Sequence, residues 1–232
     1  MILIYLTILV FCLFFIGDLL MKRKIKKEKA KVLDLQHSTD FPPISDLIKK
    51  CKLAVPEGYY FSKSHTWINI LSSGEVRVGL DALCPKLLTN IDSINLHALG
   101  NRVNKNGSMC AIYQGNKKLK FYAPIDGVIQ EVNTELQENP DLLCDDPFEK
   151  GWIYRIKPSL QFSNLDVNQE LSTDVLDWKE SELKRLVNFF LEEPPTRKKL
   201  QENIRKGKLV LEGLLDKLDS FGWVKFEESF LT

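Results

Sequence analysis

Between Val55 and Pro158 the chain is a succession of short segments rich in alternating or β-branched residues, each closed by a turn signal. In the clearest case, residues 65–70 lead into Ser72-Ser73-Gly74 and then into the alternating segment 75–80. A strand, a polar glycine turn and a second alternating strand predict a β-hairpin. Further strands are predicted over residues 91–96, 109–114, 118–122, 127–133 and 152–156, with one short helix over 81–88. Many short antiparallel strands with little helix predict a sandwich or flattened barrel.

A series of short motifs in this region resembles the glycine cleavage system H protein, in the order in which that family has them. The motifs are Ser64-His65-Thr66-Trp67 (family E-H-E-W-V), residues 76–80 (V-x-V-G-I-T), 87–96 (L-G-D-I-V-F-V-E-L), 103–107 (G-x-x-V-x-K-G), 123–133 (A-P-V-S-G-E-V-V-E-V-N), 136–143 (L-x-x-x-P-E-L-V), and 146–148 with 151–153 (D-P-Y, then G-W-L). Each motif alone is weak, and their nearly gapless order carries the resemblance. It implies a mainly β fold, a biotinyl/lipoyl-like β sandwich with a helix near residues 139–143.

The resemblance also identifies the position of a cofactor. In the family a hairpin that reads roughly E-S-V-K-A-A-S-D-V-Y-S-P-V-S-G carries lipoate on the lysine at its tip. Counting back without gaps from Pro124 puts Asn116 at the place of that lysine. An asparagine amide cannot form the lipoyl amide bond, so we expect no cofactor here. Gly115 and Asn116 both tolerate positive φ and suit a two-residue turn, so the hairpin itself is expected to remain.

Lys117 leaves an alternative open, because lipoate could be attached one residue out of register. Side chains of a strand alternate between its faces, so a shift by one residue redirects the amine. The Glu and Ser that precede the family's lysine are also replaced, here by Tyr113 and Gln114. Lys117 stands with Lys118 and Lys120 near the tip, a cluster that is typical of a solvated turn and could also contact an acidic partner.

Nothing in the sequence indicates an enzyme. His65 invites a catalytic interpretation, but the family motif to which it belongs is largely structural, so packing is favoured. The chain has no Ser/His/Asp order, no phosphate loop and no paired-carboxylate motif. The protein is therefore predicted to have no activity of its own, and it remains open whether it is an accessory subunit of an enzyme complex.

Composition excludes further classes of site. Lys and Arg number 32 and Asp and Glu 31, so no basic field indicates nucleic acid. The cysteines are odd in number and form no CxxC pair, which fits a reducing compartment better than a disulfide framework or a zinc site. They are Cys12, Cys51, Cys84, Cys110 and Cys144. Three scattered histidines, His37, His65 and His97, predict no metal site.

The N-terminus predicts a membrane anchor. Residues 1–17 carry no charged side chain, and Asp18 and Leu19-Leu20-Met21 follow. The run is just long enough to span a hydrocarbon core, and no cleavage site is visible. Residues 21–31 carry seven Lys or Arg and one Glu, which by the positive-inside rule predicts a single-pass protein with its N-terminus out and the bulk of the chain cytoplasmic.

The C-terminal part predicts helices. Residues 174–191 place apolar side chains at helical spacing, and Pro194-Pro195 ends that segment. A second helix is predicted over residues 196–218, with Gly207 and Gly213 as weak points. The two should form an antiparallel pair that buries its apolar stripe against its own β domain or against a partner, and both alternatives remain open. The candidate partner contacts are Phe189, Phe190, Leu214, Leu215, Trp223 and Phe226.

The sequence thus predicts four regions: a transmembrane helix over 1–21, a basic juxtamembrane linker with a short helix over 22–54, the H-protein-like domain over 55–158, and a helical extension over 159–232. The predicted function is a non-catalytic, membrane-anchored scaffold or accessory subunit, with the membrane and the protein subunits of a larger complex as partners. One alternative is a membrane-tethered lipoyl carrier modified at Lys117, serving one-carbon, sulfur or redox metabolism. Another is a domain that binds a small molecule or acyl group, for which the sequence offers no pocket.

Overall fold

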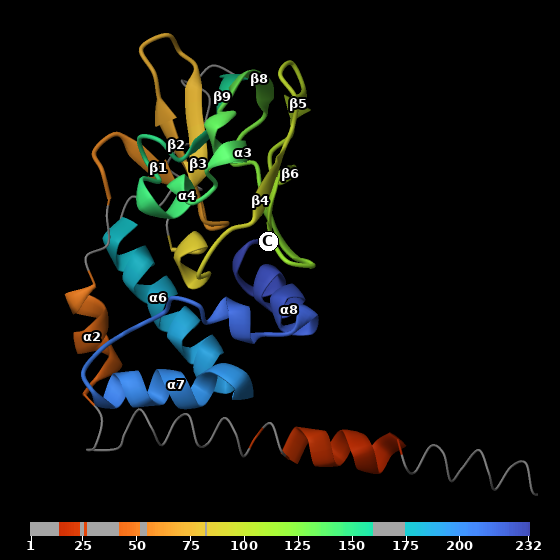
Figure 1. Cartoon of the computed structure of the whole chain (residues 1–232), viewed down its shortest axis with the longest axis vertical. Coiled ribbons are helices and arrows are strands. Elements are labelled where there is room, and N and C mark those ends of the chain that lie inside the picture. Colours follow the sequence, from red (N-terminus) through yellow and green to blue (C-terminus); the bar gives the residue numbers. More distant parts are fainter. Residues whose placement is uncertain (1–13, 24–25, 27–41, 52–54, 82, 160–174) are drawn as a thin grey trace, which may run out of the picture. The chain divides into compact units, whose positions relative to one another are not determined.

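The computed structural model describes residues 14–23, 26, 42–51, 55–81, 83–159 and 175–232, and the chain forms two compact units (Figure 1). The helical unit consists of Met1–Cys51 and Leu183–Leu209. The β unit consists of Lys52–Glu182 and Val210–Thr232. The β unit therefore continues past the predicted domain boundary at residue 158 and takes in both the start of a long helix and the C-terminal segment.

Two antiparallel sheets form the centre of the β unit. The larger has six strands in the order β1-β2-β3-β9-β8-β5, with bounds Tyr59–Phe61, Thr66–Ile70, Val76–Leu80, Trp152–Pro158, Gly127–Val132 and Arg102–Val103. The smaller has three strands in the order β4-β6-β7, with bounds Ser93–Leu96, Ser108–Gln114 and Lys117–Tyr122. The predicted mainly β sandwich is confirmed, and each predicted strand is present within a few residues.

Short helices fill the connections of the β unit. The 3₁₀ helix η1, Pro85–Leu87, occupies part of the predicted helix over 81–88. The helix expected near residues 139–143 is divided into α3, Glu135–Glu138, and α4, Leu142–Asp145. Pro140 lies between them and explains the division. Proline has no backbone N–H to donate within a helix, and it disfavours helical backbone at the residue before it.

The core of the β unit is organised around Trp67, which has no exposed surface. Its ring meets Tyr59 edge-on, at 5.1 Å between centroids, and Phe148 at 6.0 Å. Gly79 lies opposite Trp67 in the β2–β3 pairing, and a Cβ at Gly79 would come within 2.3 Å of the indole ring. The hairpin predicted from residues 65–80 therefore depends on a glycine in its second strand, where the indole needs the space.

The helical unit contains α2, Ile44–Lys50, the later part of α6, Val175–Glu192, and α7, Pro194–Arg205. At the corner between α6 and α7, side chains at the start of α7 donate hydrogen bonds to the last carbonyls of α6, which lack helical partners. The Thr196 hydroxyl donates to Phe190 O at 2.5 Å, and Arg197 Nε donates to Leu191 O at 2.7 Å. In Figure 1, α7 runs across the end of α6 instead of back along it, so the predicted antiparallel pair does not form.

The second predicted helix is shorter than expected. It ends at Arg205 instead of Leu218, because Gly207 adopts a left-handed conformation with φ +70°. Positive φ terminates a right-handed helix, and glycine adopts it at little cost. After this break the chain returns to the β unit, where it forms the 3₁₀ helix η3, Leu215–Lys217, and α8, Ser220–Phe230.

The structure contradicts the predicted membrane-spanning helix over residues 1–21. The predicted single-pass localisation with the N-terminus out is therefore wrong as well. Among the helices that the structure describes, none is both long enough and apolar enough to cross a membrane. Residues 14–23 are helical and carry an ion pair between Asp18 and Lys22 at 2.7 Å, so this helix is charged along the described stretch. Residues 1–13 of the predicted span lie outside the described residues.

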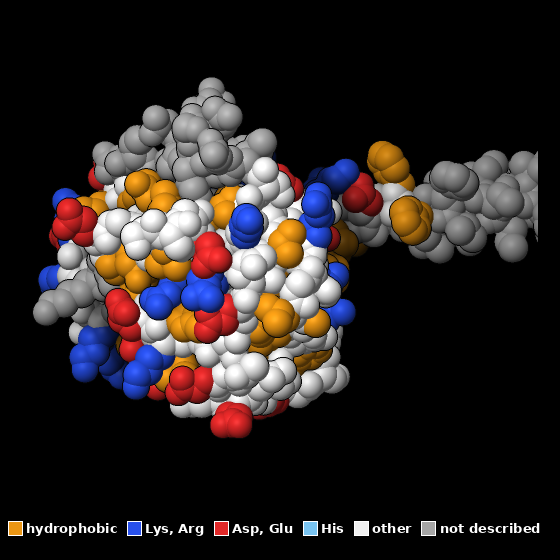
Figure 2. All heavy atoms as spheres, turned by 90° about the horizontal axis from the view of Figure 1, so that it is seen from above, with side chains coloured by type: hydrophobic (Ala, Val, Ile, Leu, Met, Phe, Trp, Pro, Cys, Tyr) orange, Lys and Arg blue, Asp and Glu red, His pale blue; other side chains and the backbone are white. Residues whose placement is uncertain are grey.

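The near-equality of charges is visible on the surface. The face drawn in Figure 2 carries basic and acidic side chains next to one another, with hydrophobic side chains scattered between them. No single sign of charge dominates that face, in keeping with the 32 basic and 31 acidic residues of the whole chain.

We predict that Gly79→Ala destabilises the protein by about 3 kcal/mol, because the new methyl group would overlap the buried indole of Trp67. Gly74→Ala is the matched control, since Gly74 has positive φ but open space around its Cβ position, and about 1 kcal/mol is expected from backbone strain. Denaturant unfolding of the two variants measures the difference. Equal losses would show that the close approach of Gly79 and Trp67 does not matter for stability.

Candidate functional site

The tip of the β6–β7 hairpin is a tight two-residue turn. Gln114 pairs with Lys117, which leaves Gly115 and Asn116 as the turn, and Gly115 has φ +58°. The preceding loop holds this turn, because Asp92 Oδ2 accepts a 2.6 Å hydrogen bond from the Gly115 amide. The Asn116 side chain is exposed at the apex. The expectation of a retained hairpin with Gly115-Asn116 at its turn agrees with this geometry.

Lys117 is engaged by the C-terminal segment of the chain. Its Nζ donates hydrogen bonds to two backbone carbonyls, Asp216 O at 3.2 Å and Leu218 O at 2.5 Å. It also lies 5.5 Å from the ring centroid of Trp223, a distance typical of a cation–π contact. The carbonyls belong to the end of η3, where backbone oxygens lack helical partners. We call these two carbonyls and the Trp223 ring the lysine cage.

The same C-terminal segment covers the edge of the smaller sheet. Strand β7 is at that edge, and the Lys120 amide donates to Glu227 Oε2 of α8 at 3.0 Å. The Tyr122 hydroxyl donates to the other oxygen of Glu227 at 3.4 Å. Burial and the charge of Glu227 raise the pKa of the Tyr122 hydroxyl. The loop before β4 also contacts this segment, because the Thr89 hydroxyl bonds to Asp216. We call residues 210–232 the cap.

The six side chains predicted to contact a partner are all buried within the chain itself. Phe189 is 9% exposed, Trp223 2%, and the other four have no exposed surface. Their apolar surface is therefore covered without a second protein. The large apolar side chains that α8 does expose are Phe221, at 77%, and Val224, at 53%. These two lie on the face of α8 opposite its buried residues.

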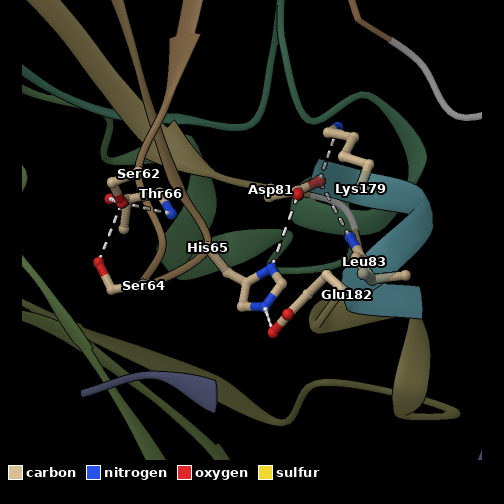
Figure 3. Close-up of polar contacts among 8 residues, drawn as sticks. All are labelled: Ser62, Ser64, His65, Thr66, Asp81, Leu83, Lys179 and Glu182. Carbon is tan, nitrogen blue, oxygen red and sulfur yellow. Dashed lines mark hydrogen bonds and ion pairs between the residues drawn. The ribbon is translucent and has the colours of Figure 1, made fainter. Parts of the chain in front are cut away.

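A second site is a buried cluster of ionisable side chains around His65 (Figure 3). His65 Nε2 lies 3.3 Å from Glu182 Oε1, and His65 Nδ1 lies 3.6 Å from Asp81 Oδ2. Lys179 Nζ lies 3.3 Å from the other oxygen of Asp81. His65 itself adopts left-handed backbone with φ +57°, which a non-glycine residue does at a cost. The cluster places the first turns of α6 against the β sheets.

The packing interpretation of His65 fits its complete burial, but sequence reasoning missed its three charged neighbours. A signal was present, because Lys179 and Glu182 continue the apolar stripe of α6 toward its start, at the spacing of Leu183, Leu186 and Val187. A charged residue in register with an apolar stripe points to a buried partner.

Charge balance explains how four ionisable groups can be buried together. Burial alone would lower the pKa of the His65 imidazole, but Cys84, Asp81 and Glu182 outweigh that effect and hold the pKa well above its usual value. Burial would raise the pKa of Asp81, yet the nearby positive charges of His65 and Lys179 hold the pKa of this carboxyl below the ordinary range. With His65 and Lys179 protonated and both carboxylates ionised, two positive charges face two negative ones. Cys84 is no nucleophile here, because burial raises the pKa of its thiol.

We predict that the free energy of unfolding falls as the pH rises above 6.5, the ordinary pKa of histidine. A raised pKa in the folded state means that the stabilisation is complete below the unfolded pKa and is lost as the pH rises through the folded pKa. His65→Asn should flatten this slope, because asparagine also tolerates positive φ but does not titrate. Urea unfolding of both proteins between about pH 6 and pH 9 measures the slopes. Identical slopes would exclude His65 as their source.

We further predict that Lys179→Met costs about 3 kcal/mol, because the buried Asp81 carboxylate loses one of its two cations. Lys184→Met is the matched control, since Lys184 is exposed on the same helix and its replacement should change stability by about 0.5 kcal/mol or less. Thermal and urea unfolding of the two variants test the difference. Similar stabilities would show that the cluster does not hold the start of α6.

Comparisons with known proteins address the β unit up to residue 180. The family model described as glycine cleavage H-protein matches residues 59–180. The chain is 37% identical over 120 residues to a probable glycine cleavage system H protein of Thermococcus gammatolerans, across 52% of this chain and 86% of that protein. It is 33% identical over 112 residues to a probable glycine cleavage system H protein of Pyrococcus furiosus, across 48% and 83%.

Among solved structures, the chain is similar to a glycine cleavage system H protein from Mycobacterium marinum. The TM-score is 0.46 at 24% identity, over 56% of this chain and 99% of that one. The family match ends at residue 180, so most of α6, all of α7 and the cap lie beyond it.

Proposed function

The chain belongs to the glycine cleavage H-protein family, and we propose that it is a member that carries no lipoate and serves as a non-catalytic accessory or scaffold module in a protein complex. The hairpin of the family is kept, and the residues beyond position 180 add surface that the family match does not include. The partners in this proposal are proteins, reached through those added residues.

The observation that carries the proposal is the side chain at the apex of the hairpin. Asn116 is exposed in the two-residue turn, where the count from Pro124 places the family's lysine. Attachment of lipoate needs an amine nucleophile, which an asparagine amide does not provide. The turn is therefore suitably presented for a swinging arm, but it lacks the atom to which the arm would be joined.

The alternative, a lipoyl carrier modified at Lys117, needs an amine that is free to move. The two carbonyls of the lysine cage lie within hydrogen-bond distance of that amine, and the Trp223 ring covers it from another side. A carrier lysine has to leave such contacts to reach an enzyme site. The contacts therefore favour a structural role for Lys117 over carriage.

The scaffold part of the proposal is supported by exposed apolar side chains outside the family core. Phe221 and Val224 project from α8 and are 77% and 53% exposed, and both lie beyond the family match, which ends at residue 180. Single exposed apolar residues are common on proteins. An exposed phenylalanine next to a valine on one helix face is the kind of feature that a protein interface uses.

We predict that the intact mass of the protein purified from its native source equals that of the unmodified chain, because neither Asn116 nor the caged Lys117 is acylated. Peptide mapping of residues 113–122 by mass spectrometry locates any adduct. A glycine cleavage H protein purified from the same cells is the control, since it should show the lipoyl adduct. A lipoyl group on Lys117 of this chain would establish the carrier alternative instead.

The scaffold role needs a separate measurement. Native purification followed by mass determination of the intact assembly should recover the chain with other proteins in fixed ratio. Phe221→Ser with Val224→Ser should reduce that recovery without lowering thermal stability, since both side chains are exposed. Recovery of the native chain as a monomer alone would contradict the scaffold proposal.

A further inference from the structure

We propose that the cap is an intramolecular inhibitor of acylation at the hairpin, because it withholds the Lys117 amine from acylating reagents and enzymes. The inference deepens the proposed function and rests on it in one respect, namely that the hairpin is not acylated in the native protein. It assigns residues 210–232 a regulatory role on the former carrier site. Lys117 then helps to hold the cap in place through its hydrogen bonds to Asp216 O and Leu218 O.

The surroundings of the Lys117 amine match its hydrogen-bonding chemistry. A lysine ammonium has three donors and no acceptor, and the cage offers two carbonyl oxygens and one aromatic face. Those carbonyls stand at the end of a 3₁₀ helix, where no backbone donor follows in the helix to satisfy them. Both partners thus gain from the contact, which is the expected property of a specific site.

The cap is anchored by polar contacts to strand β7 and to the loop before β4. Glu227 accepts hydrogen bonds from the backbone of Lys120 and from Tyr122 on β7. Asp216 binds Thr89 beside the tip, through both the amide and the hydroxyl of that residue. Trp223 is 2% exposed and donates its indole N–H to Leu215 O at 2.8 Å, which holds the ring in place. Release of Lys117 therefore requires movement of an anchored segment.

The neighbouring lysine, Lys118, lacks the contacts that hold Lys117. Strand residues alternate between faces, so Lys118 points away from the side on which Lys117 lies. Lys118 is exposed, whereas Lys117 is half-buried. The two amines are adjacent in sequence and in the same strand, and they differ in whether the cap holds them.

The reaction that the cap would slow is acylation of the Lys117 amine. In acylation by an activated ester, the neutral amine attacks the ester carbonyl, a C–N bond forms, the C–O bond to the leaving group breaks, and the amine proton passes to solvent. Attack needs a free lone pair and an approach path to nitrogen. In the cage, the nitrogen donates hydrogen bonds to two carbonyl oxygens and lies 5.5 Å from the centroid of the Trp223 ring, so the lysine must break these contacts before it can react.

The experiment is competitive acetylation of the full chain with a limiting amount of N-hydroxysuccinimidyl acetate. Mass spectrometry of peptides cut by a protease that does not cleave at lysine gives the rates at Lys117 and Lys118. We expect Lys117 to react about tenfold more slowly than Lys118, since one charge-assisted hydrogen bond is worth a factor of that order. The same ratio in the urea-unfolded chain supplies the intrinsic reactivities. A native ratio equal to the unfolded one overturns the proposal.

Variants then test whether the cap is the cause. Trp223→Leu removes the ring of the cage and should raise the Lys117 rate about tenfold, toward that of Lys118, while the Lys118 rate stays constant. Because Trp223 is buried, Thr89→Val combined with Glu227→Gln is the second variant, which loosens the cap from its polar anchors and leaves its apolar core intact. Hydrogen exchange of residues 210–232 reports whether the cap opens. An opened cap without faster acetylation of Lys117 overturns the proposal.

Failure of the inhibitory-cap proposal can be distinguished from failure of the proposed scaffold function. A lipoyl group on Lys117 in the native protein would refute the unlipoylated scaffold, whatever the acetylation rates are. Equal acetylation of Lys117 and Lys118 in an unlipoylated native protein would refute the inhibitory cap and leave the scaffold proposal standing on Asn116 alone.

Discussion

The register of β6 against β7 is the constraint from which the candidate site follows. Because Gln114 pairs with Lys117, only Gly115 and Asn116 remain for the turn, and the left-handed Gly115 makes that turn possible. The pairing also decides that Lys117 and Lys118 face opposite ways. If the turn were shifted by one residue toward the C-terminus, Lys117 would lie in the turn itself, and its amine would no longer face the lysine cage. The asparagine at the apex and the position of the lysine cage are thus two consequences of one register.

The buried cluster around His65 performs a different task within the β unit, which is to fix the first turns of α6 against the sheets. His65 and Asp81 come from the β sheets, and Lys179 and Glu182 from α6. Apolar packing would hold a helix against a sheet without specifying its rotation. Four buried charges that balance only in one arrangement specify both rotation and position, because any other arrangement leaves a charge without a partner. We take this as the physical reason for charged residues within the apolar stripe of α6.

The β domain could be predicted well from the sequence because its signals are local. Turn residues such as Ser72-Ser73-Gly74 and the alternation after them mark strands that the structure contains. Errors arose where long-range packing decides. The helix expected over 196–218 stops at Gly207, whose left-handed backbone ends it, and the chain then returns to the hairpin. No local pattern indicates that Trp223 covers Lys117, since the two are more than 100 positions apart. For the same reason the His65 cluster was seen as one residue instead of four.

Under the proposed function, two independent barriers stand between this hairpin and a carrier function, and they differ in kind. At Asn116 the barrier is chemical, because the side chain is exposed at the apex but has no nucleophilic amine. At Lys117 the barrier is positional, because the amine is present but is held by the cage. Neither barrier needs the other, as the contacts of the cage are made by Lys117 and not by Asn116. If the cap served only to protect the sheet edge, Glu227 on Lys120 would be enough, and a lysine in the cage would add nothing to that protection. The cage is therefore better explained as a site for the lysine itself, which is the premise of the proposed inhibitory cap.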